Sequence, residues 1–317
     1  MKGRRDAPAR IAPAARPRRG RVRPETWLAV AFIAPTILIV CGVYLYPAVA
    51  TLLYSFSELE VASLRIDRFV GLEHFRGAVA SEEFKAVVLR TLYFGLMVVV
   101  LTTVPAFLIA LLLKERFRGR NFLRVIVLLP WALPPVVSGV LWSQMFHADF
   151  GFINGLIRTA GGEGNIIWLG DPVLALHAVI IAEVWRWIPF ATLFILAGLQ
   201  TIPPETYEAA SVDGANAWQK FRYLTVPLMW PILLPVTIFM FVWAMKAFDT
   251  IFVLTQGGPR MGTTTLNYLV YRQSFQEFSF GQAAATAYIL SLLTLLVIAV
   301  LAFLRWRARI RSGEVAS

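Results

Sequence analysis

The chain has 317 residues, of which 58% are hydrophobic and 15% charged, and its formal net charge is +11. Its mean hydropathy of +0.65 lies well to the apolar side of a typical soluble domain. The composition therefore excludes an ordinary soluble globular protein and favours a chain that crosses the membrane several times.

Six segments are long and apolar enough to cross a hydrocarbon core, which needs about 20 residues per helix. We therefore expect an all-α integral membrane protein with a six-helix domain over residues 27–306. The predicted spans are Trp27 to about Phe56, Val87 to Leu113, Phe122 to Phe146, Val173 to Leu199, Leu228 to Leu254 and Ala283 to Trp306.

The segments outside this domain are two short tails, residues 1–26 and 307–317. The first is rich in Arg, Pro and Ala, so it is predicted to be disordered and attracted to anionic membrane lipid. The sequence "PAVA" at residues 47–50 loosely resembles a signal-peptide cleavage site. The apolar run from Trp27 to Tyr46 is longer than the usual 7–15 residues of a signal peptide, which favours a retained first helix.

The positions of the thirty Lys and Arg residues predict the topology. If the spans alternate, nine before Trp27, five between Lys114 and Arg124, two in the loop around Glu208 and four after Leu304 lie on one side, against seven on the other. By the positive-inside rule, both termini and the Glu208 loop are predicted to be cytoplasmic. The basic excess is thus a topology signal, and no nucleic-acid partner is expected.

Several site types receive no support from the sequence. The single cysteine, Cys41, excludes an intrachain disulfide, and the three histidines, His74, His147 and His177, have no metal-ligand spacing. No P-loop sequence is present, so the chain supplies no ATP site of its own. We expect no metal, no cofactor and no catalytic residue.

Prolines and charges interrupt the third and fourth spans. Pro130, Pro134 and Pro135 predict a kinked or broken third helix, which either lines a cavity or is a packing kink. In the fourth span Glu183 and Arg186 are one helical turn apart. Ionisable residues within a span are costly, so they mark a functional site or form a structural ion pair.

The loop at residues 200–227 is polar and punctuated by turn residues. Pro204 suits the first position of a helix, predicted to run to Val212, and Asp213-Gly214 predicts the turn that ends it. Asn216 and Gln219 have the spacing of a capping box that begins a second short helix. The loop is therefore predicted to be a compact helix–turn–helix at the membrane surface.

The fifth span carries Trp243, Lys246 and Asp249 at intervals of three, which places them on or near one face of a continuous helix. Lys246 and Asp249 either form a structural pair or mark a functional site.

The pattern from Glu208-Ala209-Ala210 through Gly214 to Leu224-Thr225-Val226-Pro227 resembles the EAA loop of binding-protein-dependent ABC importer permeases. Leu224 and Val226 stand where that loop usually has Ile and Leu, both conservative changes. "FDTIFVLTQGGP" at residues 248–259, "LLPWALPP" at 128–135 and "EVWRWIPF" at 183–190 are similar to the maltose, trehalose and glycerol-phosphate group of these permeases.

The resemblance implies a type I permease fold and a sugar-transporting assembly. Its expected partners are a dimer of cytoplasmic ATPase subunits, a second permease and an extracytoplasmic sugar-binding protein. The loop would couple the chain to the ATPase, through the residues Glu208, Ala209, Ala210, Asp213 and Gly214.

A sugar pathway needs aromatic faces for the pyranose ring and polar groups for its hydroxyls. The candidates for this role are Glu183, Arg186, Trp243, Lys246, Asp249, Gln256 and Asn267. Arg186 or Lys246 in the pathway would instead favour an anionic cargo such as glycerol phosphate, and a polyol is a further alternative. A membrane-embedded transferase is the alternative from another class, but no nucleophile–base arrangement or paired carboxylates support it.

Overall fold

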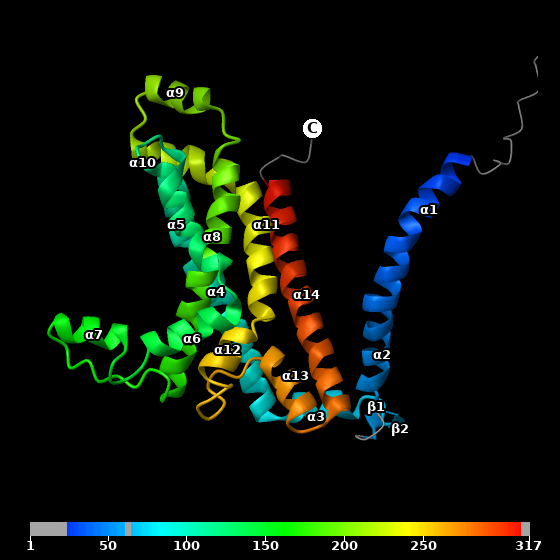
Figure 1. Ribbon diagram of the computed structural model, residues 1–317. Coiled ribbons are helices and arrows are strands. Elements are labelled where there is room, and N and C mark those ends of the chain that lie inside the picture. The colour runs from blue at the N-terminus through cyan, green and yellow to red at the C-terminus, as the bar shows by residue number, and fades with distance from the viewer. Residues whose placement is uncertain (1–23, 61–64, 312–317) are drawn as a thin grey trace, which may run out of the picture. The chain divides into compact units, whose positions relative to one another are not determined.

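The computed structural model of the protein describes residues 24–60 and 65–311 (Figure 1). It divides into two compact units, Met1–Thr51 and Leu52–Ser317. The described part of the first unit is helical: α1 (Pro24–Ile39) continues through a π-helical turn, η1 (Val40–Leu45), into α2 (Tyr46–Ser55), which runs on into the start of the second unit. Of the tail predicted at residues 1–26, the first 23 residues lie outside the described part, and Pro24 already begins α1.

The second unit contains a small hairpin and the remaining helices. The strands are β1 (Ser57–Leu59) and β2 (Ile66–Phe69), which pair antiparallel. The helices are α3 (Glu73–Ala80), α4 (Glu82–Lys114), α5 (Arg120–Ala132), α6 (Pro135–Met145), α7 (Phe152–Thr159), α8 (Pro172–Leu199), α9 (Pro204–Val212), α10 (Ala217–Lys220), the π-helical η2 (Phe221–Thr225), α11 (Val226–Met245), α12 (Asp249–Leu254), α13 (Leu266–Phe275) and α14 (Phe280–Arg311).

The described residues contain five helices that are long and apolar enough to cross a membrane, or six if α5 and α6 count as one bent span. The predicted six-span helical fold is therefore supported. Sequence patterns missed the hairpin and the short helices α3, α7 and α13, which lie between the spans. Helix α14 continues to Arg311, into the segment that was assigned to the C-terminal tail.

The two longest central helices begin at strong N-terminal caps. The Ser81 hydroxyl accepts from the Phe84 amide to start α4, and the Asp171 carboxylate accepts from the Val173 and Leu174 amides to start α8. These caps satisfy amide groups that lack a partner within the helix. Each helix therefore begins where its polar loop meets the apolar span.

The third span is broken as its prolines predict. Helix α5 ends at Ala132, Leu133 and Pro134 are extended, and α6 starts at Pro135 with its axis bent by 96° from that of α5. Proline removes backbone donors and disfavours helical geometry in the residue before it, which explains the break.

The fifth span ends earlier than predicted. Helix α11 stops at Met245, and Lys246 to Phe248 separate it from the short α12. The continuous helix expected from Leu228 to Leu254 is therefore wrong, and with it the common helical face for Trp243, Lys246 and Asp249. The Asn267 side-chain amide, from α13, donates to the Lys246 carbonyl at 2.8 Å and satisfies a group that the break releases.

Helices α4 and α8 form the centre of the second unit. One apolar cluster joins α4, α6, α8 and α12 around Phe94 and Ile180, and a second joins α4, α8 and α11 around Leu199 and Met229. A third cluster around Phe84 and Leu290 joins α4 to α11, α13 and α14.

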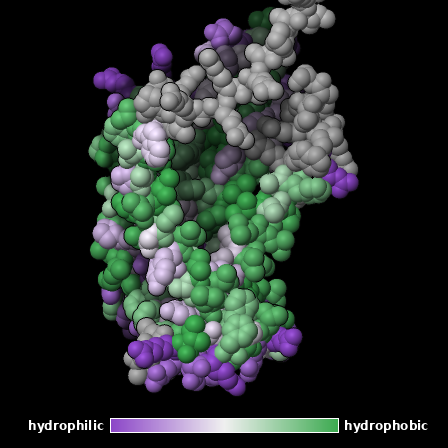
Figure 2. All heavy atoms as spheres, turned by 90° about the vertical axis from the view of Figure 1, so that its right-hand side faces the viewer, coloured by the Kyte–Doolittle hydropathy of each residue, from purple (hydrophilic) through white to green (hydrophobic). Residues whose placement is uncertain are grey.

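The two ends of the second unit differ in structure (Figure 1). Helices α9 and α10 lie at one end, here called the α9 end, and α3 and α13 lie at the opposite end, the α13 end. On the face shown in Figure 2, hydrophobic residues fill the middle and hydrophilic residues gather along the lower edge, as a membrane-crossing protein requires.

Candidate functional site

The loop at residues 200–227 folds as the predicted helix–turn–helix. Helix α9 spans Pro204 to Val212 and ends with Gly214 in the left-handed conformation, φ +79°. The Ala215 amide donates to the Ala210 carbonyl and the Gly214 amide to the Ser211 carbonyl, which is the hydrogen-bond pattern of a Schellman cap. The chain thus turns sharply within three residues.

The second half of the loop begins at the predicted capping box. The Asn216 side chain accepts from the Gln219 amide at 2.9 Å, and the Gln219 side chain accepts from the Asn216 amide at 2.8 Å. The short helix expected here is not a separate element, because α10 runs through η2 into α11 without interruption. Residues 217–245 are one helix that crosses from the loop through the membrane.

The inner side of the loop is anchored to the helix bundle. The Tyr207 hydroxyl hydrogen-bonds the Thr225 hydroxyl at 3.1 Å, and the Lys114 ammonium lies 4.0 Å from the centre of the Tyr207 ring. The ring of Phe221 meets that of Phe107 edge-on. Within the loop, the Lys220 ammonium donates to the Ser211 hydroxyl at 2.6 Å and joins α9 to α10. These contacts fix the loop relative to α4 and α11.

The outer side of the loop is exposed and has no partner within the described residues. The Glu208 carboxylate makes no hydrogen bond or ion pair there, and Ala209, Asp213 and Gly214 are also exposed, while Ala210 is half-buried. Apolar side chains share this exposure, since Val212 is 88% and Trp218 67% exposed. A hollow of about 330 Å³ lies between the end of α9 and α10.

Sequence reasoning found the exposed motif but missed its supports. Tyr207 and Thr225 are 18 positions apart, and no local pattern joins them. The Lys220–Ser211 contact likewise depends on how the turn folds back. Val212 and Trp218 were visible as apolar residues in a polar segment, which is the signal that could have identified them.

The fourth span holds a buried polar cluster centred on Glu183, whose side chain is 1% exposed. Arg186 forms the ion pair that its spacing allowed, at 3.0 Å, and the Trp187 indole donates to the same carboxylate at 2.9 Å. The hydroxyl of Thr250, the second residue of α12, donates to the other carboxylate oxygen. Glu183 therefore connects α8 to the segment that follows the break in the fifth span.

Aromatic rings extend this cluster. The Trp187 ring lies 5.1 Å from that of Trp243, and the Arg186 guanidinium lies 5.1 Å from the Trp187 ring. The Nε of Arg186 is buried and has no hydrogen-bond partner among the described residues. Of this group, Trp243 is substantially exposed, so it is the member most accessible from outside the chain.

The remaining candidates lie around α12. Lys246 and Asp249 are both exposed, and no ion pair joins them in the described part of the chain, so they are not the structural pair that spacing allowed. Gln256 is exposed with φ +49°, in the loop after α12. Asn267 is half-buried, and its amide is used in the bond to the Lys246 carbonyl.

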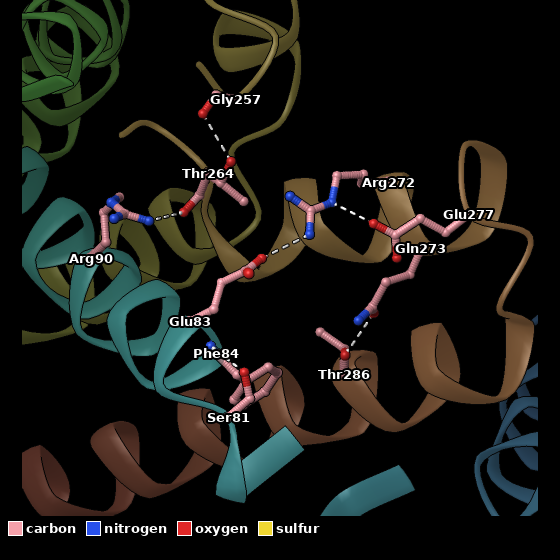
Figure 3. Close-up of polar contacts among 10 residues, drawn as sticks. All are labelled: Ser81, Glu83, Phe84, Arg90, Gly257, Thr264, Arg272, Gln273, Glu277 and Thr286. Atoms are coloured by element: carbon pink, nitrogen blue, oxygen red, sulfur yellow. Dashed lines mark hydrogen bonds and ion pairs between the residues drawn. The ribbon is translucent and has the colours of Figure 1, made fainter. Parts of the chain in front are cut away.

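The α13 end is held together by polar contacts that the sequence did not predict (Figure 3). Arg272 forms ion pairs with Glu83 at 3.0 Å and with Glu277 at 2.8 Å, so it joins the start of α4 to α13 and to the turn before α14. Arg90 donates to the Thr264 carbonyl, and Thr264 donates to the Gly257 carbonyl. The segment after α12 is thus fixed against α4.

The fold defines a class of protein, the multi-pass helical membrane protein. A chain in the crystal structure of a bacterial alginate ABC transporter, in complex with alginate pentasaccharide-bound periplasmic protein, aligns over 87% of this chain and 93% of its own, with a TM-score of 0.76 and 22% identity. At this identity the likeness shows a shared fold, which confirms the predicted type I permease architecture.

Sequence comparison gives the family. Residues 103–311 match the family model described as "Binding-protein-dependent transport system inner membrane component", and the chain belongs to that family. The trehalose/maltose transport system permease protein MalF of Thermococcus litoralis is 35% identical over 260 residues, 82% of this chain and 88% of the relative. The sn-glycerol-3-phosphate transport system permease protein UgpA of Yersinia enterocolitica is 32% identical over 271 residues, 85% and 91%.

The chain is therefore a membrane-embedded component of a binding-protein-dependent transport system, and a permease subunit rather than an enzyme. The predicted family is confirmed, and the alternative of a membrane-embedded transferase is set aside. The multi-pass inner-membrane localisation follows from the same family and from the apolar helices.

Proposed function

We propose that this chain forms half of the translocation pathway of an ATP-driven sugar importer. We further propose that the loop at residues 200–227 couples it to the conformational change of the ATPase subunits. The observation that carries the proposal is the construction of that loop: its outer side is exposed and unpartnered, while its inner side is fixed to α4 and α11. The trehalose/maltose permease relative supports a sugar as cargo.

Coupling requires an element that is rigid and whose position differs between two states. The Schellman cap, the capping box and the Tyr207 contacts make the loop rigid. In the proposed assembly, Glu208 makes a charged contact with an ATPase subunit, Ala209 and Ala210 allow close approach, and Asp213 and Gly214 form the turn. Movement of the ATPase dimer is then transmitted directly into α11, because α10 and α11 are one helix.

The proposed topology places the α9 end in the cytoplasm, together with both termini. Twenty of the thirty Lys and Arg residues fall on that side of the membrane if the spans alternate. The α13 end then faces the extracytoplasmic sugar-binding protein. The second permease completes the pathway.

For the pathway, we propose different roles for the seven polar candidates. Trp243, Lys246, Asp249 and Gln256 are exposed and supply one aromatic face and three polar groups, the mixture that a sugar requires. Arg186 flanks them beside Trp187. Glu183 and Asn267 support the pathway without contacting the sugar, because their polar groups already form hydrogen bonds within the chain.

Import of glycerol phosphate is the second candidate function, and one observation favours it. Lys246 is exposed and unpaired within the described residues, so a cation is available to an anionic cargo, and UgpA is among the relatives. Competition of unlabelled glycerol phosphate against uptake of labelled trehalose or maltose by the reconstituted transporter distinguishes these cargoes. A polyol is uncharged, so its competition against uptake of the labelled sugar would not depend on the charge of Lys246.

The coupling role is tested with Glu208→Lys in the complete transporter, reconstituted with its ATPase subunits, second permease and binding protein. We expect binding-protein-stimulated ATP hydrolysis and sugar uptake to fall together, because the contact charge is inverted. The matched control is Glu163→Lys, which inverts an exposed carboxylate in the loop after α7, away from the loop at residues 200–227. Normal uptake and normal stimulated hydrolysis in Glu208→Lys would remove the loop from this role.

A further inference from the structure

The turn between α4 and α5, residues 115–119, carries an excess of positive charge that the chain itself does not neutralise. Arg116 and Arg118 lie in the turn, and Arg120 and Arg124 in the first turns of α5. None of these four arginines forms an ion pair with any described residue, although the exposed Glu115 is adjacent in sequence. The Nε atoms of Arg120 and Arg124 are also buried, and neither has a hydrogen-bond partner among the described residues.

The same turn is hollowed. A groove of about 320 Å³ is lined by Arg116, Phe117, Gly119, Arg120, Asn121 and Phe122. Two of its six lining residues are cationic and two are exposed aromatics, Phe117 at 39% and Phe122 at 71%. The groove therefore offers guanidinium donors beside apolar rings.

The position of the groove decides which ligand fits this mixture. It lies where α4, which is long and apolar enough to cross a membrane, ends at Lys114 and the first half of a bent span begins. A basic segment at the end of a span is where lipid headgroups are expected. Guanidinium groups bind phosphate oxygens by paired, charge-assisted hydrogen bonds. The α5 amides at the groove add to this, since Gly119 provides no side-chain cap and no acidic residue occupies the first turn of α5.

We propose that the α4–α5 turn is a binding site for an anionic phospholipid, with Arg116 and Arg120 on the headgroup phosphate and Phe117 and Phe122 against its glycerol and acyl carbons. The occupant is a lipid rather than a soluble anion because exposed aromatic rings flank the arginines at the end of a membrane-crossing helix. The site lies at the α9 end, where Lys114 contacts Tyr207 of the loop. Bound lipid thus neutralises charge next to the segment that anchors α9.

The test uses the assembled transporter in detergent, titrated with phosphatidylglycerol and measured by native mass spectrometry. Phosphatidylcholine serves as the lipid with no net charge, and inorganic phosphate as the soluble anion. The variant Arg116→Gln/Arg120→Gln is expected to weaken phosphatidylglycerol binding by roughly tenfold or more. The matched control, Arg76→Gln/Lys85→Gln, removes two exposed charges outside the turn and is expected to bind as the wild type does.

A second variant, Arg116→Lys/Arg120→Lys, keeps the charge but loses the paired guanidinium hydrogen bonds, so it is expected to weaken phosphatidylglycerol binding measurably, though less than the Gln variant does. It carries the test if the Gln variant does not fold, and unchanged binding in it would then overturn the proposed arginine contacts. Equal affinity for phosphatidylcholine, equal loss in the control, or phosphate binding as tight as that of lipid would each overturn the proposal. Loss of the ATPase subunits from the Gln variant with lipid binding unchanged would do so too, because the arginines would then be a protein contact.

Discussion

Glu183 shows how a charged residue is accommodated inside this membrane protein. An isolated carboxylate in a low-dielectric interior is strongly disfavoured, yet this one accepts hydrogen bonds from Arg186, Trp187 and Thr250. The sequence indicated only the Arg186 contact as possible, because residues three positions apart are neighbours on the surface of a helix. Thr250 is 67 positions away, and its approach depends on packing that no local pattern encodes.

We predict that Glu183→Ala lowers the stability of the transporter by about 3–5 kcal/mol, because it leaves Arg186 largely buried without its counter-charge. Glu183→Gln should cost less, since its single amide oxygen can still accept from the Trp187 indole while its amide NH2 donates to the Thr250 hydroxyl. Thermal unfolding of the purified complex measures both. Glu58→Ala is the matched control: it breaks the exposed pair with Arg68, which solvent screening makes a small contribution. Equal effects of Glu183→Ala and Glu58→Ala would contradict the prediction.

At the scale of elements, local chemistry predicted the helix starts, the turns and the proline break, but it did not predict the break at Lys246. The cap at Gly214, the capping box at Asn216 and the break at Pro134 follow from side-chain and backbone geometry within a few residues. The break at Lys246 has no proline, while Pro231 and Pro235 lie inside an intact α11. It is supported by Asn267, a contact across 21 positions, so the sequence could not reveal it.

Gly214→Ala is expected to weaken coupling more than Gly214→Asn. A Cβ at this position meets no atom within 4 Å, so the cost comes from the left-handed backbone alone, about 1–2 kcal/mol for Ala and less for Asn. We expect a lower binding-protein-stimulated ATPase rate in Gly214→Ala and near-normal thermal stability of the bundle. Hydrogen exchange of the loop amides reports the local loosening. Identical exchange in Gly214→Ala and wild type would show that the turn tolerates a side chain.

Across the whole second unit, α4 and α8 lie between three apolar clusters, and the polar candidates occupy positions around the break after α11. The sequence predicted the number of spans and the helix–turn–helix at residues 200–227, because both depend on composition and short spacing. It left open which polar residues were exposed. That required the paths of α8, α12 and α13 relative to one another.

The pathway assignment predicts that Asp249→Ala reduces sugar uptake several-fold with little change in thermal stability, because the carboxylate is exposed and unpaired within the described residues. Asp249→Asn separates the charge from the hydrogen-bonding groups, and a neutral sugar should tolerate it better. Asp67→Ala, an exposed change on the hairpin, is the control. Unchanged uptake and sugar affinity in Asp249→Ala would retire this residue from the pathway.

The unbroken helix from Ala217 to Met245 has a mechanical consequence. At 1.5 Å per residue its 29 residues make a rod about 43 Å long. A tilt of about 5° around one end would displace the other end by about 4 Å, given that length. The exposed loop and the polar segment around Lys246 therefore lie at opposite ends of one helix. A small rotation imposed at the loop is sufficient to move the polar groups around Lys246 by about the length of a hydrogen bond to a sugar hydroxyl.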